Sequence, residues 1–240
     1  MSERSAIEWT EATWNPVTGC SKVSPGCDNC YAERLAVRLR AMRNARYTNG
    51  FEVTLHDDQL DLPLRWRTPR TVFVNSMSDL FHERVPDEYI ARVFEAMGRA
   101  HWHTFQVLTK RPGRMASLVA RILPDPLPNV WLGTSIELDR YVWRADRIRE
   151  TPAAVRFLSC EPLLGPLPNL VLVDIDWMIV GGESGPGHRP VLGSWVEGLR
   201  DRCVEAGVPF FFKQWGGRTP TSGGRSLEGR DWAEMPSLAP

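Results

Sequence analysis

The stretch from Cys20 to Cys30 holds three cysteines within eleven residues, spaced Cys-x6-Cys-x2-Cys. A run of helix formers, residues 32–42, begins almost directly after the third cysteine. Thiolates grouped this closely suit zinc or an iron–sulfur cluster. The N-terminus of the following helix favours negative charge and lowers the pKa of a nearby thiol. This loop is therefore the first candidate for chemistry in the chain.

The odd number of cysteines in this loop favours one kind of metal group. Structural zinc usually has four protein ligands, whereas three cysteines leave one position open, which suits an iron–sulfur cluster with one reactive iron. Two alternatives stay open. One is a zinc site that a distant residue completes, for example His82, His101 or His103. The other is a set of metal-free buried thiols.

The strand ends offer a second set of candidate residues. Short apolar runs alternate with helical patterns along the chain, which predicts an α/β fold. A short polar cluster follows each apolar run. The carboxyl ends of parallel strands share one face, where barrel enzymes hold their active sites. We therefore expect the clusters to converge beside the cysteine loop. They are Ser76/Ser78/Asp79, Thr109/Lys110, Thr134/Ser135/Glu137, Cys160/Glu161, Gly182/Glu183/Ser184 and Lys213/Gln214.

The elements that would position these residues form a partial or complete parallel (β/α) barrel of six to seven strands, of the TIM type. We expect one barrel-like domain over residues 1–216, with the cysteine loop at 19–30. Residues 217–240 are a tail that is either disordered or folded across the site. The expected strands are 7–13, 71–75, 104–108, 130–133, 155–158, 177–180 and 209–212. The expected helices are 31–46, one opening at Pro86, one ending near Leu123, 138–150, and 193–206 with Gly207 as a left-handed C-cap.

Composition limits the partners. The 29 basic and 29 acidic residues cancel, so overall charge predicts neither nucleic-acid nor membrane binding. No apolar run approaches 18 residues, so no membrane span is expected. Five cysteines without a signal peptide predict a reducing cytoplasm. A local basic patch could meet an anionic substrate or be a solvated helix face; its members are Lys22, Arg34, Arg38, Arg40, Arg43 and Arg46.

The loop resembles a known one. The motifs Asn15-Pro16, Gly19-Cys20 and Gly26-Cys-Asp-Asn-Cys-Tyr-Ala32 are similar to the cluster loop of radical S-adenosylmethionine (SAM) enzymes of the spore photoproduct lyase type. Six residues separate the first two cysteines here, where three are usual. Almost the whole chain resembles a phage- and prokaryote-associated, three-cysteine, radical-SAM-like family of unknown function. The matching phrases are residues 9–16, 108–112, 133–135, 159–162, 181–184 and 213–216.

The resemblance implies an enzyme with a [4Fe–4S] cluster on Cys20, Cys27 and Cys30. The fourth iron would chelate SAM, and one electron from a donor would release a 5'-deoxyadenosyl radical that attacks an unknown substrate. The lyase likeness and the basic patch make nucleic acid or a nucleotide the candidate substrate. The reaction class, whether lyase, transferase or oxidoreductase, stays open.

The resemblance also implies cofactor contacts, each of which has a structural alternative as a surface residue, helix cap or ion-pair partner. They are Lys110 and Ser135 to the carboxylate or ribose of SAM, Ser76 and Asp79 near its methionyl or ribose group, Glu183 in a Gly-Gly-Glu motif, and Tyr31 near the adenine. Cys160 could donate a hydrogen atom to a substrate radical or be a small core residue. A hydrolase that uses Asp79, Glu137, Glu161 or Glu183 as acid and base is a further alternative.

Overall fold

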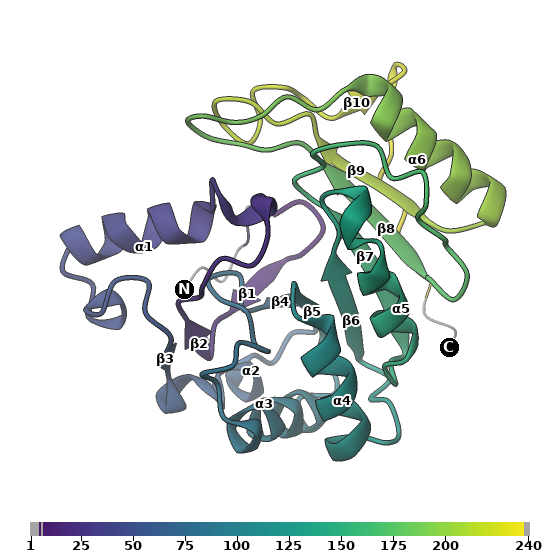
Figure 1. Cartoon of the computed structure of the whole chain (residues 1–240). Helices are drawn as coiled ribbons and strands as arrows, with labels where there is room; N and C mark the ends of the chain where they lie inside the picture. The colour runs from purple at the N-terminus through teal and green to yellow at the C-terminus, as the bar shows by residue number, and fades with distance from the viewer. Residues whose placement is uncertain (1–4, 6, 238–240) are drawn as a thin grey trace. The chain divides into compact units, whose positions relative to one another are not determined.

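The computed structural model describes residues 5 and 7–237 and has the α/β fold that the sequence predicts (Figure 1). Its seven-stranded sheet has the order β1-β4-β5-β6-β7-β8-β9. The order runs from β1 to β9 without closing in the described part of the chain, so the fold is a partial parallel barrel. The strands are β1 (Ala12–Trp14), β4 (Thr71–Val74), β5 (Thr104–Thr109), β6 (Val130–Ser135), β7 (Val155–Cys160), β8 (Trp177–Gly181) and β9 (Phe210–Gln214).

The chain divides into two compact units, which are described separately. The first unit consists of the chain up to Val23, Cys30–Leu132 and Thr151–Ala154. The second unit consists of Ser24–Asn29, Gly133–Glu150 and the chain from Val155 onward. The cysteine loop contributes to both units. The prediction of one domain over residues 1–216 stays a prediction.

In the first unit, β1, β4 and β5 pair in parallel, and their apolar residues are buried in register. Trp14 aligns with Val74, and its ring lies 5.8 Å from that of Phe105. The helices α3 (Asp87–Arg99) and α4 (Pro112–Ile122) each bury one apolar side, as expected for helices that cover a sheet. Helix α1 (Tyr31–Ala41) instead buries only small residues, Ala32 and Ala36.

In the second unit, β7, β8 and β9 also pair in parallel. Trp177 lies at the centre of one sheet face, with its ring 5.7 Å from that of Phe157 and 6.1 Å from that of Phe211. Helix α6 (Gly193–Ala206) has the predicted bounds. It ends at Gly207, whose φ of 67° is the left-handed C-cap that the sequence predicts.

Several elements differ from the prediction in length. The first strand is only β1, and the expected helix 31–46 stops at Ala41, because Arg43 has a φ of 56° that breaks the helix before the short 3-10 turn Ala45–Tyr47. The expected helix 138–150 splits into a 3-10 turn, Asp139–Tyr141, and α5 (Trp143–Arg149). Shorter additional elements are α2 (Leu62–Arg65), the 3-10 turns Pro25–Cys27 and Asp57–Gln59, and the pair β2 (Val17–Thr18) with β3 (Thr54–Leu55).

The tail folds back on β9. Its hairpin pairs β10 (Ser226–Leu227) with β11 (Arg230–Asp231). The backbone N–H of Phe212 donates to the carbonyl of Trp232 at 2.9 Å, and Trp232 is buried. Residues 226–234 are thus part of the fold of the second unit. None of the helices in the described part of the chain has the length and apolar character that crossing a membrane requires.

Candidate functional site

In the first unit, side chains at the carboxyl ends of β1 and β4 hold the start of the cysteine loop. Asn15 Oδ1 accepts from the backbone N–H of Met77 at 2.9 Å, and Ser78 Oγ donates to the carbonyl of Val17 at 2.9 Å. Gly19 has a φ of 84°, and a Cβ there would collide with the carbonyl of Glu52. The chain can therefore turn into the loop at this point only with glycine.

Asp79 and Arg111 connect the ends of β4 and β5 to the first cysteine. Asp79 accepts from the hydroxyl of Thr109 at 2.7 Å and from Arg111 Nη1 at 3.1 Å. The same Nη1 lies 3.5 Å from Cys20 Sγ, and Nη2 donates to Ser21 Oγ at 2.9 Å. Asp79 and Arg111 are almost fully buried. A fixed cation therefore lies against the sulfur of Cys20.

The surroundings of Cys20 favour its neutral thiol when no metal is bound. Burial raises the pKa of Cys20 to about 11, and the carboxylate of Asp79 adds to the increase, while the charge of Arg111 opposes it. A metal must displace this proton to bind the sulfur. The guanidinium of Arg111, which opposes the increase in the pKa of Cys20, is also the group that would donate a hydrogen bond to the sulfur of a metal-bound thiolate.

His82 lies beside this part of the loop. Its Nδ1 accepts from the backbone N–H of Arg84 at 3.1 Å, so a neutral ring carries its proton on Nε2, which lies 2.8 Å from Ser21 Oγ. Burial and the charge of Arg111 lower the pKa of His82, which keeps the ring neutral. His103 has both ring nitrogens in contact with backbone groups of Arg70 and Pro63.

In the second unit, Glu137, which follows β6, holds the segment before Cys27. Ser24 Oγ donates to Glu137 Oε1. A Cβ on Gly26 would lie 2.5 Å from the same carboxylate, so only glycine fits here without a shift. The fully buried Glu137 also accepts from Arg144 Nη1 at 2.9 Å. The side chain of Arg144 is 2% exposed, so this is a buried ion pair.

Glu183, which follows β8, holds the segment after Cys27. It accepts from Arg189 Nη2 at 2.5 Å and from Asn29 Nδ2 at 2.9 Å. Arg189 in turn donates to the carbonyl of Pro25 at 2.9 Å and pairs with Asp28 at 3.3 Å. Burial alone would raise the pKa of Glu183, but the hydrogen bonds from Arg189 and Asn29 outweigh it and lower the pKa.

The ends of β7 and β9 meet in another ion pair. Lys213 Nζ lies 2.5 Å from Glu161 Oε1, and both side chains are largely buried. A Cβ on Gly181, in the strand between them, would lie 3.2 Å from the carboxyl carbon of Glu161, so the glycine leaves room for this side chain to cross β8.

Cys160 is the last residue of β7. It is fully buried, and its Sγ is 3.5 Å from Met178 Sδ. Burial raises its pKa strongly, and the nearby thiol of Cys203 on α6 adds to the increase. This is the environment of a core cysteine, and it gives no support to a role as hydrogen-atom donor.

Of the remaining predicted cofactor contacts, Ser76, Lys110 and Ser135 lie at strand ends and Tyr31 lies at the start of α1. In the first unit, Ser76 Oγ donates to Asn15 Oδ1 at 3.2 Å, and the half-buried Lys110 donates its backbone N–H to Asp79 at 3.0 Å. Tyr31, at the first turn of α1, is 53% exposed and donates its hydroxyl to the carbonyl of Ser76. In the second unit, Ser135 is buried, and its carbonyl accepts from Arg144 Nη1 at 2.8 Å.

The residues that the sequence analysis missed are the cations. Arg111, Arg144 and Arg189 each neutralise one of the strand-end carboxylates. A buried carboxylate needs such a partner, so each predicted buried Asp or Glu was a signal that a basic residue must lie nearby. Spacing does not identify which one, because these arginines follow their carboxylates by 32, 7 and 6 residues.

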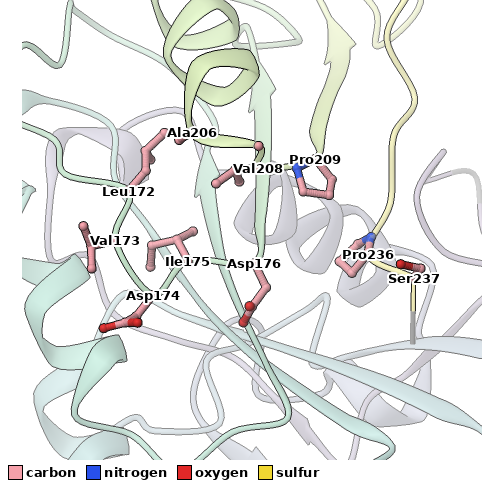
Figure 2. Close-up of a pocket in the computed structure, with 11 residues that line it drawn as sticks. Leu172, Val173, Asp174, Ile175, Asp176, Ala206, Val208, Pro209, Pro236 and Ser237 are labelled. Atoms are coloured by element: carbon pink, nitrogen blue, oxygen red, sulfur yellow. The ribbon is translucent and has the colours of Figure 1, made fainter. Parts of the chain in front are cut away.

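Two cavities of the described chain lie away from these residues. The first has a volume of about 640 Å³ and is lined by Ile175, Asp176, Val208 and Pro209, among others (Figure 2). These residues precede β8 and β9, so the cavity is at the amino ends of the strands. The second, of about 380 Å³, lies between α3 and the end of α4 and is largely apolar.

Three thiols are the kind of ligand that an iron–sulfur group takes. Cys20, Cys27 and Cys30 are free and half-buried, whereas Cys160 and Cys203 are buried in the core. Ser24 Oγ lies 3.9 Å from Cys27 Sγ, and Cys30 is the N-cap residue of α1. Within residues 5 and 7–237, no three His, Cys, Asp or Glu side chains are grouped so that they could hold a metal ion.

Fold and site together define an α/β protein with a partial parallel barrel and a cysteine loop anchored at its strand ends. Residues 4–236 match the model of a family described as "Protein of unknown function (DUF5131)", and the chain belongs to this family. No curated protein and no solved structure matches the chain.

Proposed function

We propose that the chain is a radical SAM-like enzyme in which Cys20, Cys27 and Cys30 bind a [4Fe–4S] cluster. The observation that carries this proposal is that the backbone of the cysteine loop is held by hydrogen bonds while its three thiols stay accessible. The backbone N–H of Gly19 donates to the carbonyl of Met77 at 3.0 Å and Arg189 donates to the carbonyl of Pro25, yet the three thiols are outside disulfides and only half-buried. A loop built to present thiols needs this combination, because its backbone must be rigid while the sulfurs stay accessible.

The cluster and SAM, when bound, would supply one-electron cleavage of a carbon–sulfur bond, and the protein supplies binding, orientation and shielding. Arg111 is the residue that would donate to the sulfur of Cys20, since its Nη1 already lies 3.5 Å away. Hydrogen bonds to ligand sulfurs tune cluster potentials. Arg189 holds the Cys27 segment through the carbonyl of Pro25 and the side chain of Asp28.

The six proposed cofactor residues divide into two kinds. Asp79 and Glu183 already accept hydrogen bonds on both carboxylate oxygens, and we assign them to positioning the loop. Lys110, Ser76, Ser135 and Tyr31 keep the proposed role of direct SAM contacts. An electron donor completes the partners of the proposed reaction.

A zinc-stabilised binding protein is a second candidate, because Nε2 of His82, one of the histidines that could complete a zinc site, lies 2.8 Å from the hydroxyl of Ser21, the residue after Cys20. A hydrolase is disfavoured because Asp79, Glu137, Glu161 and Glu183 each pair with a cation. A general acid needs a carboxyl group that stays protonated, whereas the pKa of Glu183 is lowered.

The test is SAM cleavage by protein purified without oxygen. The protein is reduced with dithionite, SAM is added, and 5'-deoxyadenosine is measured by chromatography. We expect product from the wild type and at least a tenfold loss in Lys110→Ala, with Arg121→Ala, whose side chain is 66% exposed and pairs with Asp87, as the control. Zinc in place of iron, with no product, would instead favour the second candidate.

A further inference from the structure

Helix α1 has an unusually exposed apolar surface. Of the eleven large apolar side chains that are exposed in the described part of the chain, five lie between residues 23 and 42. Three of them share one side of α1, since they follow the i, i+4 and i+11 spacing of a helix face. They are Tyr31, Leu35 and Met42, which are 53%, 38% and 66% exposed.

Arg34 and Arg38 lie on the same side of the helix, at i+3 and i+7 from Tyr31. We call the five residues Tyr31, Arg34, Leu35, Arg38 and Met42 the α1 stripe. The opposite side of the helix is packed, since Ala32 and Ala36 are buried with Tyr47 and Met77. The stripe is thus a mixed apolar and cationic surface on a helix that is otherwise fixed to the first unit.

The charge of this segment is local. Residues 30–46 contain five arginines and one acidic residue, Glu33, which gives a net charge of +4. The whole chain has a net charge of 0, so the remaining residues carry −4. Glu33 already pairs with Lys22 at 3.4 Å, and Arg46 pairs with Asp58 at 3.4 Å. The excess of positive charge is therefore concentrated on α1 and the residues that follow it.

We propose that the α1 stripe binds single-stranded nucleic acid, and that this is the substrate class of the proposed enzyme. The role of nucleic acid as substrate rests on the proposed function, whereas its binding to the stripe does not. Guanidinium groups that meet phosphates, interleaved with apolar side chains on which bases pack, form the usual surface for single strands. A run of arginines with one acidic residue fits a chain that carries a charge on every nucleotide better than it fits a protein partner of mixed charge.

The stripe also points toward the candidate site of its own unit. Its first member, Tyr31, follows Cys30 directly, and its hydroxyl is bound to the carbonyl of Ser76 at the end of β4. A strand that lies along the stripe would therefore lead to the carboxyl ends of the strands. A single strand fits this route, because a base must leave a duplex before an enzyme can act on it.

The test measures the binding of fluorescein-labelled 20-nucleotide DNA and RNA by anisotropy, as a function of salt. We expect Arg34→Gln/Arg38→Gln, which removes both arginines of the stripe, to weaken binding at least tenfold at 100 mM salt, and to lower the salt slope by about 1.4, since each phosphate contact contributes about 0.7. The charge-matched control is Arg84→Gln/Arg147→Gln, whose arginines are exposed and already paired with Glu52 and Glu150. It should change affinity less than twofold.

Met42→Ser tests the apolar half of the stripe, with an expected loss of affinity and an unchanged salt slope. The inference would be overturned if the test and control double variants lost affinity equally, or if the wild type bound duplex as tightly as single strands. It would also be overturned if the wild type bound no nucleic acid, or preferred an acidic redox protein. Iron content is measured in parallel. The arginine variants should keep wild-type iron, so loss of nucleic-acid binding and failure of the proposed cluster are read separately.

Discussion

At the scale of single residues, the candidate site consists of carboxylates that are each neutralised by one cation. The carboxylates of the pairs Asp79–Arg111, Glu137–Arg144 and Glu183–Arg189 follow β4, β6 and β8. Removing one member of a buried pair costs more than the pair itself contributes, because the other charge stays buried without a partner. These pairs are therefore the residues at which substitution should affect the cysteine loop most.

Arg111→Ala should destabilise the protein by about 3–5 kcal/mol, the usual cost of leaving a buried charge unpaired. The measurement is urea unfolding followed by fluorescence. Arg84→Ala breaks an exposed pair with Glu52 and should cost less than about 1 kcal/mol. Equal costs for the two variants would mean that Arg111 is not an internal partner of Asp79.

Gly26→Ala should destabilise the protein by about 1–3 kcal/mol, as overpacking usually does, because its Cβ would lie 2.5 Å from the Glu137 side chain. Gly113→Ala is the matched control. Gly113 lies in the first turn of α4 with no atom within 4 Å of an added Cβ, so alanine should stabilise by about 0.4–1 kcal/mol. A neutral Gly26→Ala variant would show that the loop does not lie against Glu137.

At the scale of elements, the strands were easier to predict than the helix ends. The apolar runs identify the strands from β4 to β9, because strands that are buried on both faces have near-continuous apolar sequences. Helix α6 was also predictable, since Gly207 marks its end. The end of α1 was not, because its sequence stays helix-favouring to Arg46 while the chain turns at Arg43. The one local signal is Asn44, whose side chain accepts from the backbone N–H of Arg46 and caps the 3-10 turn that follows.

The hydrogen bonds of Glu183, which follows β8 and holds the Cys27 segment, should contribute less stability in acid. The lowered pKa of Glu183 means that its ionised form is stabilised by folding. This contribution is complete above the ordinary value of 4.5 and is lost as the pH falls through the lower value of the folded protein. Glu183→Gln should therefore be less stable than wild type by about 1–3 kcal/mol at pH 7, and the difference should shrink below pH 4.5.

The measurement is the free energy of unfolding of both proteins between pH 7 and pH 3. Glu205→Gln, an exposed residue of α6, is the control and should follow the wild type throughout. If the difference in unfolding free energy between wild type and Glu183→Gln were constant with pH, the contacts of Arg189 with the Cys27 segment would not depend on the charge of Glu183.

At the scale of the whole molecule, the cysteine loop belongs to both compact units. Cys20 and Cys30 lie in the first unit and Cys27 in the second. The sequence predicts that all the strand-end clusters meet this loop, because parallel strands share one edge. Glu137 and Glu183 contact the loop in the second unit, and Asp79 reaches it through Arg111 in the first, whereas Glu161 pairs with Lys213 instead. The sequence could not predict the arginines that hold the loop, because buried charge pairs are set by packing and not by spacing.

The central claim is that three sulfurs of this loop hold an iron–sulfur cluster. The most direct measurement is the iron, sulfide and zinc content of protein purified without oxygen. We predict about four iron and four sulfide per chain, lost in Cys20→Ala, Cys27→Ala and Cys30→Ala and kept in the core control Cys203→Ala. Stoichiometric zinc without iron, or iron that survives all three substitutions, would contradict the claim.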